Sequence, residues 1–276
     1  MTRTWLITGT STGLGRLLTE TLLARGERVA ATLRKPHALD DLKAQYDERL
    51  WIASLDVTDA DAVRRVVDRA FTELGKIDLV VNNAGFAVFG AAEEASDAHI
   101  RAQLDTNLIG SMQVIRAALP HLREQGGGRV LQVSSEGGQV AYPNFSLYHA
   151  SKWAIEGFVE SVLLEVAPFG IEFTIVEPGP AKTNFRDGLV TPPPMAVYDN
   201  TPAGEIRRAV LNDAFALRGD PQKMVDAMIA SVDVCPAPRR LTLGSGAYER
   251  VRAALVERLA VLDAQKDIAL STDYDE

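Results

Sequence analysis

The chain has 276 residues, of which 46% are hydrophobic and 24% charged, a composition typical of a soluble globular protein with ample material for a core. Its formal net charge of −8 disfavours a nucleic acid or an anionic membrane as partner, because no basic block offsets it. The start, MTRTWLITGT, becomes polar too soon for a signal peptide, and no window approaches the roughly 18 uninterrupted apolar residues of a membrane-spanning helix. We therefore expect a cytoplasmic protein.

Short apolar runs alternate along the chain with longer helical patterns. The runs that predict strands lie at residues 4–8, 28–32, 50–55, 77–82, 129–133, 171–176 and 240–243. Between them lie amphipathic stretches, such as the one that begins at Asp59. Strands that are apolar throughout suit a parallel sheet buried on both faces, with helices as crossovers. The pattern predicts an α/β fold with a doubly wound, seven-stranded parallel sheet (Rossmann-like) and helices on both faces, in a single domain over residues 1–276.

The first strand runs into a glycine-rich turn, TGTSTGLG, which contains Gly9, Gly13 and Gly15 and is followed by a helical pattern. A dinucleotide site requires this order of strand, glycine turn and helix. Glycines permit close approach of the backbone, and the helix N-terminus supplies free N–H groups for a pyrophosphate. The spacing is G-x-x-x-G-x-G, and the alternative is a plain glycine-rich turn in an α/β protein.

The residues after the second strand bear on which dinucleotide binds. An NAD site normally places an acidic residue there to bind the ribose 2′-hydroxyl. This chain has ATLRKP instead, with Arg34 followed by Lys35 and no carboxylate. A guanidinium suits a 2′-phosphate, so the sequence favours NADP over NAD. The alternative is that both residues are solvated surface charges.

The stretch YHASK places Tyr148 four residues before Lys152. In a helix these positions share a face, so both side chains can point into one site. A nearby cation favours the phenolate and lowers the pKa of a tyrosine, which would make the pair a tuned acid/base. The spacing alone is also common among surface residues.

The segment from about Phe185 to Pro202, which contains TPPPM, breaks the alternation of strands and helices. A long loop poor in regular pattern is unusual unless it is functional or mobile. We expect a substrate lid at about residues 184–220 that orders over cofactor and substrate. The alternative is that its side chains only pack against the body or fill a subunit interface. The tail after Ser271 resembles a frayed acidic end.

Taken together, TGTSTGLG, NNAG at 82–85 and YHASK make the chain resemble the short-chain dehydrogenase/reductase family. The resemblance runs from residue 4 to about 183, with the motifs in the family's order and spacing. It implies an oxidoreductase that transfers a hydride between NADP(H) and an alcohol or ketone. It also implies a homodimer or homotetramer, and the sequence does not choose between the two.

The resemblance implies four catalytic residues. Tyr148 is the acid/base, and Lys152 lowers its pKa and holds the nicotinamide ribose. Ser135 lies thirteen residues before Tyr148, the family spacing, so we choose it over Ser134 as the donor to the substrate oxygen. Asn107, in LDTNLIGS, stands where the family keeps an asparagine and could hold a water that relays protons from Lys152.

The resemblance also implies which residues bind the cofactor. Asp56 and Val57 flank the adenine ring, Asn83 lies nearest the cofactor in the NNAG turn, and the EPGPAKT segment covers the nicotinamide. The expected cofactor-binding residues are Gly9, Ser11, Thr12, Gly13, Leu14, Gly15, Arg34, Asp56, Val57, Asn83, Ala84, Gly85, Tyr148, Lys152, Pro178, Gly179 and Thr183. No metal is expected.

Apolar side chains are frequent in the segments expected to border the reacting carbon. They are Phe86, Val88, Phe89, Tyr142, Phe145, Leu147, Phe185, Leu189, Val190, Met195 and Tyr198. Only Lys182 and Arg186 lie nearby as candidate clamps for an anion. Because small-molecule pockets are mostly apolar with a few polar anchors, we expect a sizeable apolar ketone or alcohol as substrate.

The remaining candidates have simpler interpretations. The single cysteine, Cys235, excludes an intramolecular disulfide. Residues His99, His121 and His149 share no metal spacing and are expected at the surface or its boundary; Trp5 and Trp51 are expected in the core. Glu136 could line the site, although capping or solvation is favoured.

Two other functions stay open. The epimerase or dehydratase branch shares Tyr-x-x-x-Lys but usually carries a substantial extra substrate domain, whereas only about 90 residues follow EPGPAKT here. A non-catalytic NADP-binding redox sensor would be expected to lack Tyr148 or Lys152, and both are present.

Overall fold

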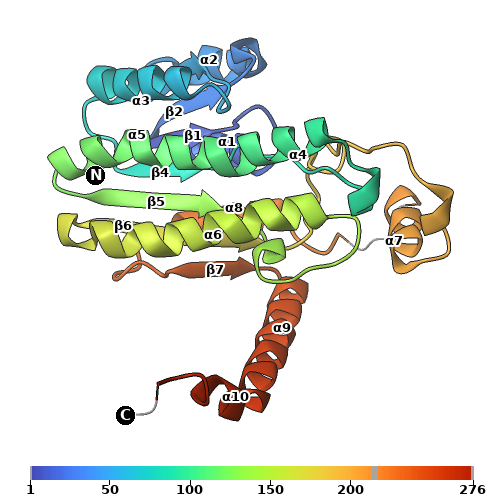
Figure 1. Ribbon diagram of the computed structural model, residues 1–276. Coiled ribbons are helices and arrows are strands. Elements are labelled where there is room, and N and C mark those ends of the chain that lie inside the picture. Colours follow the sequence, from blue (N-terminus) through green and yellow to red (C-terminus); the bar gives the residue numbers. More distant parts are fainter. Residues whose placement is uncertain (1, 213–216, 275–276) are drawn as a thin grey trace.

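The structure is a computed structural model that describes residues 2–212 and 217–274 (Figure 1). Within these residues, seven parallel strands form one sheet in the order β3-β2-β1-β4-β5-β6-β7. The strands are β1 Thr4–Thr8, β2 Arg28–Leu33, β3 Leu50–Ser54, β4 Leu79–Asn82, β5 Gly128–Val133, β6 Ile171–Pro178 and β7 Arg240–Leu243. Each of the seven predicted runs matches a strand to within two residues at either end, and the predicted doubly wound α/β fold is confirmed.

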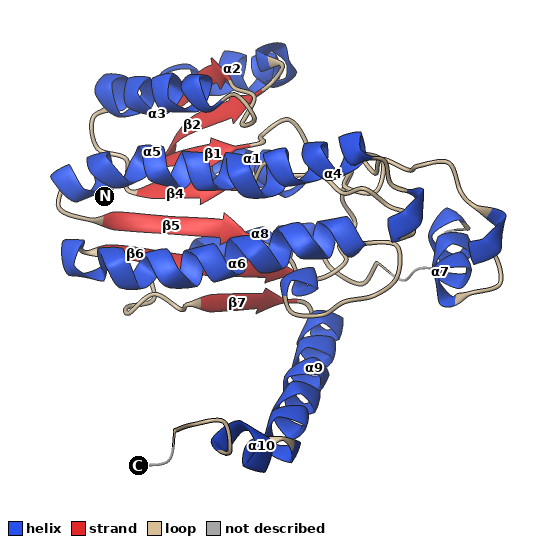
Figure 2. Cartoon of the chain, viewed as in Figure 1, coloured by secondary structure: helices blue, strands red, loops and turns tan. Residues whose placement is uncertain are grey.

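Helices cover both faces of the sheet (Figure 2). The α-helices are α1 Gly13–Ala24, α2 Asp40–Tyr46, α3 Ala60–Leu74, α4 Asp97–Leu104, α5 Ser111–Glu124, α6 Ser146–Val166, α7 Pro202–Leu211, α8 Pro221–Ser231, α9 Ser245–Ala264 and α10 Lys266–Leu270. Short helical turns are η1 Pro36–Leu39, η2 Asp47–Arg49, η3 Ala92–Glu94, η4 Asp105–Gly110, η5 Glu136–Gly138, η6 Ala167–Phe169 and η7 Ala196–Tyr198. No helix of the described chain is long and apolar enough to cross a membrane.

The apolar character of the strands follows from the two cores that they separate. Side chains alternate between the faces of a strand, so Trp5 and Ile7 of β1 pack with α1 and α8, whereas Leu6 packs with α3, α5 and α6. Trp5 is fully buried, as expected. Trp51 lies on the edge strand β3 and is only half-buried, with its indole N–H 2.5 Å from a carboxylate oxygen of Glu73. Trp51 therefore packs against the core at its margin rather than inside it, because β3 is an edge strand with no neighbour on its outer side.

The strand order reverses direction between β1 and β4. In parallel α/β sheets the loops at the carboxyl ends of the strands separate at such a point and leave a crevice. The loop after β1 turns toward β2, where the Gly9 N–H donates to the carbonyl oxygen of Thr32 at 2.9 Å. The loop after β4 turns the other way, toward α4 (Figure 1). This crevice positions the candidate site.

The segment from residue 184 to 212 lies against the loops at the carboxyl end of the sheet. It is irregular except for η7 and α7, in agreement with the sequence pattern. Val190 forms a parallel bridge with Val88, and the Asn144 side-chain amide donates to the carbonyl oxygen of Ala203 at 2.7 Å. Residues 213–216 of the predicted lid lie outside the described residues. The segment therefore meets the body at several fixed contacts.

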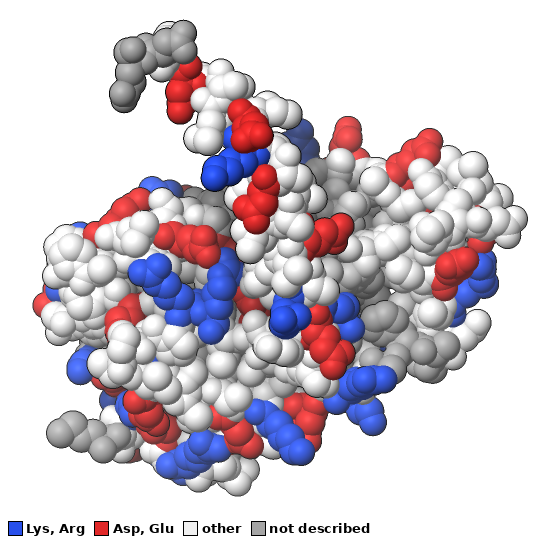
Figure 3. Space-filling view, turned by 90° about the horizontal axis from the view of Figure 1, so that it is seen from below, with Lys and Arg blue, Asp and Glu red and all other residues white. Residues whose placement is uncertain are grey.

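Helices α9 and α10 project away from the sheet beyond β7 (Figure 1). Along α9 only Ala247 and Val251 are buried. Viewed from this side, Lys and Arg side chains alternate with Asp and Glu rather than gathering into a patch of one sign (Figure 3). The predicted frayed tail includes residues 275–276, which lie outside the described residues; Ser271 itself follows directly on α10.

Candidate active site

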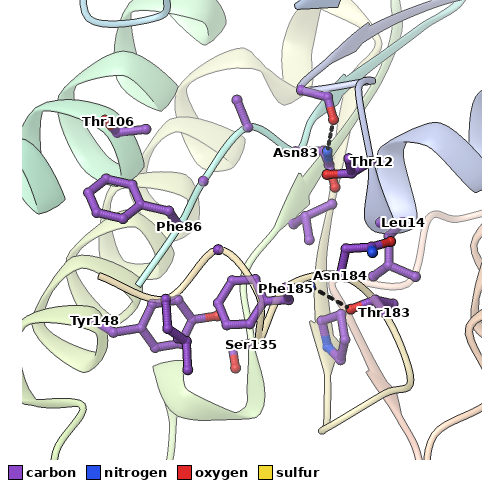
Figure 4. A pocket seen from close by; sticks show the side chains of 18 of the residues that line it. Thr12, Leu14, Asn83, Phe86, Thr106, Ser135, Tyr148, Thr183, Asn184 and Phe185 are labelled. Carbon is purple, nitrogen blue, oxygen red and sulfur yellow. Dashed lines mark hydrogen bonds between the residues drawn. The ribbon is translucent and has the colours of Figure 1, made fainter. Parts of the chain in front are cut away.

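A cavity of about 680 Å³ opens at the carboxyl ends of β1, β2, β4, β5 and β6 (Figure 4). Among the described residues that line it are most of those expected from the sequence: Gly9, Ser11, Thr12, Gly13, Leu14, Arg34, Asp56, Val57, Asn83, Ala84, Gly85, Ser135, Tyr148, Lys152, Pro178, Gly179 and Thr183. Of the expected set, Gly15 and Asn107 lie behind the cavity wall. The structure thus brings the glycine turn, the NNAG turn and the YHASK pair to one site.

The glycine turn is shaped by close backbone packing. Gly9 and Gly13 have φ angles of +71° and +60°, in the left-handed region that favours glycine. At Gly15 a Cβ would lie 2.4 Å from the Asn83 side-chain nitrogen, so only glycine lets α1 approach the NNAG turn this closely. The role of Gly15 is therefore packing beneath the cavity.

The N-terminus of α1 opens onto the cavity. Its N-cap residue, Thr12, makes no side-chain capping hydrogen bond within the described structure, and the first turn carries no acidic residue. The first N–H groups of a helix have no partner within the helix and attract anions. The turn can therefore accept an anionic group such as a pyrophosphate.

Asn83 braces the turn from the side of β4. Its side-chain amide donates to the carbonyl oxygens of Thr8 and Gly9, at 2.9 and 3.1 Å. The Thr8 hydroxyl in turn accepts from the backbone N–H groups of Asn83 and Ala84, each at 3.0 Å. These bonds lock the ends of β1 and β4 together, so Asn83 shapes the cavity wall as well as lining it.

At the other end of the cavity, Arg34 and Asp56 follow β2 and β3. The Asp56 carboxylate accepts from the Thr58 N–H at 3.0 Å and from its hydroxyl at 2.8 Å. These hydrogen bonds, with the positive charge of Arg34, hold the pKa of Asp56 below its usual value. The Arg34 side chain is exposed at the cavity edge, so its guanidinium is accessible to a ligand.

The YHASK pair lies on α6 with both side chains buried. Tyr148 and Lys152 are 8% and 5% exposed, and the Lys152 Nζ lies 5.5 Å from the centre of the Tyr148 ring. The ammonium also donates to the carbonyl oxygen of Val133, at the end of β5, at 3.0 Å. The helix therefore presents phenol and ammonium on one face, next to the end of β5.

The pKa values of this pair are set mainly by burial. Burial raises the pKa of Tyr148 to about 12, against a hydrogen-bonding interaction with Ser135 that lowers it. Burial likewise lowers the pKa of Lys152 to about 8. The expected fall in the Tyr148 pKa is therefore wrong for the protein alone, because loss of solvent disfavours the phenolate more than the surrounding groups favour it.

The two serines after β5 have different partners. The Ser135 hydroxyl accepts from the Gly137 N–H at 3.0 Å and lies beside the Tyr148 phenol. The Ser134 hydroxyl instead donates to Glu156, with 2.5 Å between the oxygens. Ser135 is thus the serine placed to act together with Tyr148.

Asn107 lies in the π-helical turn η4, between α4 and α5. Its side-chain amide donates to the carbonyl oxygen of Phe86 at 2.8 Å, and its Oδ1 accepts from the Phe86 N–H at 3.1 Å. In a third, longer bond the Asn107 amide donates to the Ser151 hydroxyl at 3.4 Å. The side chain therefore fixes the loop after the NNAG turn from behind the cavity.

Two buried polar residues near Ser135 were placed elsewhere by the sequence interpretation. Glu136 is 1% exposed and lines the cavity, so the preference for capping or solvation is wrong; its carboxylate pairs with Arg250 of α9 at 2.8 Å. His149 is 5% exposed rather than at the surface. Its Nδ1–H donates to the Gly137 carbonyl oxygen at 2.9 Å, and its Nε2 accepts from the Tyr142 N–H at 3.3 Å. Both hold the loop that carries Ser135.

Of the three histidines considered from the sequence, His99 and His121 lie at the surface or its boundary, as predicted. His99 accepts from the Ser96 N–H at the start of α4, at 3.2 Å. His121 pairs with Asp68 at 2.7 Å and stacks on the Phe71 ring. No group of three or more His, Cys, Asp or Glu in the described chain could hold a metal ion.

The far end of the cavity has an apolar wall. Six of the predicted side chains line it, namely Phe86, Tyr142, Phe145, Phe185, Leu189 and Val190, together with Val210 and Leu217, which the sequence did not single out. Phe185 lies over the Tyr148 ring, with 5.8 Å between ring centres (Figure 4). The other predicted side chains, Val88, Phe89, Leu147, Met195 and Tyr198, lie outside the described cavity lining. Val210 lies on the buried face of α7, three residues after Arg207, so the helical spacing of this segment could have indicated it.

The two candidate anion clamps lie in different places. Arg186 lines the main cavity. Lys182 lines a smaller adjoining cavity of about 330 Å³ together with Ser11, Thr12 and Arg16, at the outer side of the glycine turn. Lys182 therefore faces the glycine turn rather than the Tyr148 end of the site.

Comparison with known proteins agrees with this geometry. The family model described as short chain dehydrogenase matches residues 3–192. The oxidoreductase BOA17 of Botryotinia fuckeliana is 36% identical over 250 residues, which cover 90% of this chain and 91% of that protein. A short-chain dehydrogenase from Streptomyces avermitilis has a crystal structure that superposes with a TM-score of 0.91 at 36% identity, covering 99% of this chain and 98% of that one.

A second solved structure was determined with a nucleotide. The short chain dehydrogenase from Burkholderia cenocepacia in complex with NADP superposes with a TM-score of 0.74 at 28% identity, covering 95% of this chain and 97% of that one. Matches of this extent, over the segment that carries the glycine turn and the YHASK pair, establish that the chain belongs to the short-chain dehydrogenase/reductase family and is an oxidoreductase.

Proposed function

We propose that this protein is an NADP-dependent carbonyl reductase or alcohol dehydrogenase, which moves a hydride between NADP(H) and an apolar ketone or alcohol. The observation that carries the proposal is the single cavity that joins the α1 N-terminus and Arg34 at one end to Ser135, Tyr148 and Lys152 at the other. A dinucleotide laid along this cavity would present its two ends to chemically suitable groups.

The residues present fit the cofactor. The left-handed glycines and the open N-terminus of α1 suit a pyrophosphate. The exposed Arg34 suits a 2′-phosphate, in a position where an NAD enzyme normally has a carboxylate. The related Burkholderia protein crystallised with NADP supports the same choice.

The chemistry divides between the cofactor and the chain. When bound, NADPH supplies the hydride that adds to the carbonyl carbon. Tyr148 gives its phenolic proton to the carbonyl oxygen, and Ser135 donates a hydrogen bond that stabilises the charge developing on this oxygen. Lys152 stabilises the resulting phenolate by its positive charge, and a proton from solvent restores the phenol. In alcohol oxidation the same groups act in reverse, with Tyr148 taking the proton.

The apolar wall of the cavity supports an apolar substrate. Phe86, Phe145 and Phe185 surround the Tyr148 end, where the reacting carbon would lie. The buried carboxylate of Glu136 lines the same end and disfavours an anionic group there. The segment at about 184–220 acts in this proposal as the lid that encloses the substrate.

A panel of ketones tests the proposal. We expect NADPH oxidation whose kcat/KM rises with the apolar size of the ketone, and a marked preference for NADPH over NADH. A preference for short carboxylated or phosphorylated carbonyls would contradict the substrate class. Tight NADPH binding with no turnover on any carbonyl would indicate a redox sensor instead.

The proposal extends to assembly and location. We expect a homodimer or a homotetramer, supported by exposed apolar side chains such as Ile109 of η4 and Trp153 of α6, which are 44% and 41% exposed. Light scattering of the purified protein measures the assembly. A cytoplasmic location is part of the same proposal, and fractionation of cells tests it.

A further inference from the structure

A buried carboxylate, Glu156, lies on α6 one turn beyond Lys152. Tyr148, Lys152 and Glu156 follow one another at four-residue spacing, so they occupy one face of the helix. Glu156 is only 3% exposed, and Lys152 beside it is 5% exposed. A buried charge is costly unless another charge compensates it, so an ammonium and a carboxylate in these positions stabilise each other.

The Glu156 carboxylate is held in place on both oxygens. Oε1 accepts from the Ser134 hydroxyl at 2.5 Å, and Oε2 accepts from the Arg240 guanidinium of β7 at 2.6 Å. Gly138 packs against it, since a Cβ there would lie 1.8 Å from Oε1. The carboxylate thus has one position, directly behind the loop that begins with Ser135.

The buried carboxylates around this position outnumber the guanidinium that pairs with them. Arg240 pairs with two buried carboxylates, Glu156 and Glu177, and with the exposed Glu160. One guanidinium therefore faces two buried negative charges. The Glu177 carboxylate is also satisfied by the side chains of Gln139 and Thr242, each at 2.7 Å. The remaining negative charge lies on the Lys152 face of α6, at Glu156.

Other charged groups near Lys152 are already paired or exposed. From η5, Glu136 pairs with Arg250 of α9. His149 of α6 is neutral, because its Nδ1–H donates and its Nε2 accepts. The π-helical turn packed on α6 presents the neutral Asn107, whereas the charged residues of α4 and η4 are exposed: Asp97, Arg101 and Asp105. Among the described residues, Glu156 is therefore the buried carboxylate on the Lys152 face of α6, and its charge acts on the Lys152 ammonium.

We propose that Glu156 is a positioning residue for the Tyr148–Lys152 pair, the buried counter-ion that keeps the Lys152 side chain an ammonium during the reaction. The inference rests on the proposed function, because it assigns Lys152 its role there. Burial lowers the pKa of Lys152 to about 8, and the Glu156 carboxylate acts against this fall. Without Glu156, Lys152 loses its proton at a lower pH, and ketone reduction declines with it.

The pH profile of ketone reduction tests this role. Glu156→Gln keeps the shape of the side chain and removes its charge, so the alkaline limb of kcat/KM should move to lower pH by about one unit. Glu160→Gln is the matched control, because it removes another Arg240 partner on the same helix, 55% exposed. Its profile should stay at the wild-type pH. An unmoved limb in Glu156→Gln, or an equal shift in both variants, would overturn the proposal.

A second variant covers the case in which Glu156→Gln does not fold. Arg240→Gln removes the guanidinium that competes with Lys152 for the Glu156 carboxylate. The alkaline limb of kcat/KM should therefore move to higher pH. No shift, or a shift to lower pH, would again overturn the proposal. NMR titration of protein labelled with 13C-lysine measures the corresponding changes in the Lys152 pKa without any substrate. The Lys152 signal is assigned by its absence from the spectrum of Lys152→Arg. A missing reductase activity would therefore count against the proposed function and leave the role of Glu156 testable.

Discussion

The Arg207 guanidinium of α7 pairs with the Glu94 carboxylate of η3, and these side chains are only 10% and 1% exposed. Glu94 also accepts from the backbone N–H groups of Ala91 and Met195, at 2.7 and 2.8 Å. One carboxylate thus joins the loop after β4 to both parts of the segment above it, η7 and α7. The predicted lid is therefore anchored to the body of the protein at Met195 and Arg207.

Removal of this ion pair should loosen the segment. Arg207→Met leaves the Glu94 carboxylate buried without its cation, which costs about 3–5 kcal/mol where no other group compensates. Because the two backbone N–H donors to Glu94 remain, we expect the free energy of unfolding to fall by an amount at the lower end of that range. Proteolysis between residues 183 and 212 should become faster. Arg208→Met is the control, because the exposed Arg208 bonds only to the Asp199 carbonyl oxygen among its described partners. This variant should leave the stability and the rate of proteolysis unchanged.

Low pH should loosen the same contact in the unmodified protein. Hydrogen bonds from Met195 and Ala91 and the charge of Arg207 outweigh burial and hold the pKa of Glu94 below its usual value. A lowered folded-state pKa contributes stability above the unfolded value of about 4.3 and loses it as pH falls through the folded value. Cleavage of the segment by pepsin should therefore accelerate below about pH 4. Arg207→Met should lack this step.

Tyr148→Phe removes one oxygen from the cavity and should leave the packing of the ring intact. Loss of a positioned acid/base typically lowers turnover by at least ~10²-fold. We expect a fall of this size in ketone reduction, with NADPH affinity, measured by fluorescence, close to that of the wild type. Activity retained in this variant would exclude Tyr148 as the proton donor.

Arg34→Asp should change cofactor choice. A carboxylate at this position repels a 2′-phosphate and suits the free 2′-hydroxyl of NAD, so kcat/KM should fall far more for NADPH than for NADH. Lys35→Asp makes the same charge change one residue further on, outside the described cavity lining, and should have a much smaller effect. A wild-type preference for NADH would contradict the assignment of Arg34 and leave the fold unaffected.

The fold and most of the site follow from local sequence patterns. Apolar runs predict the strands, and parallel strands bring their carboxyl ends to one edge, which places the glycine turn, NNAG and Ser135 together. Interactions between distant parts of the chain were not predictable in this way. Glu136 is buried because Arg250, more than a hundred residues later, reaches it from α9. The direction of the Tyr148 pKa depends on how completely the folded protein excludes water from the phenol, which the spacing to Lys152 does not reveal.

Two glycines near the site should respond in opposite ways to the same substitution. Gly138→Ala places a Cβ 1.8 Å from Glu156 Oε1 and 2.9 Å from the Ser134 hydroxyl, so the buried carboxylate must move. Overpacking of this kind costs roughly 1–3 kcal/mol, and turnover should fall because the loop carrying Ser135 shifts with it. Gly157→Ala, on the exposed side of α6, meets no described atom within 4 Å and should stabilise the helix by about 0.5–1 kcal/mol with unchanged turnover. Chemical denaturation measures the stability of both variants, and steady-state kinetics measures their turnover. Equal stability changes would mean that Glu156 is free to move, which would also weaken its assignment as a fixed counter-ion.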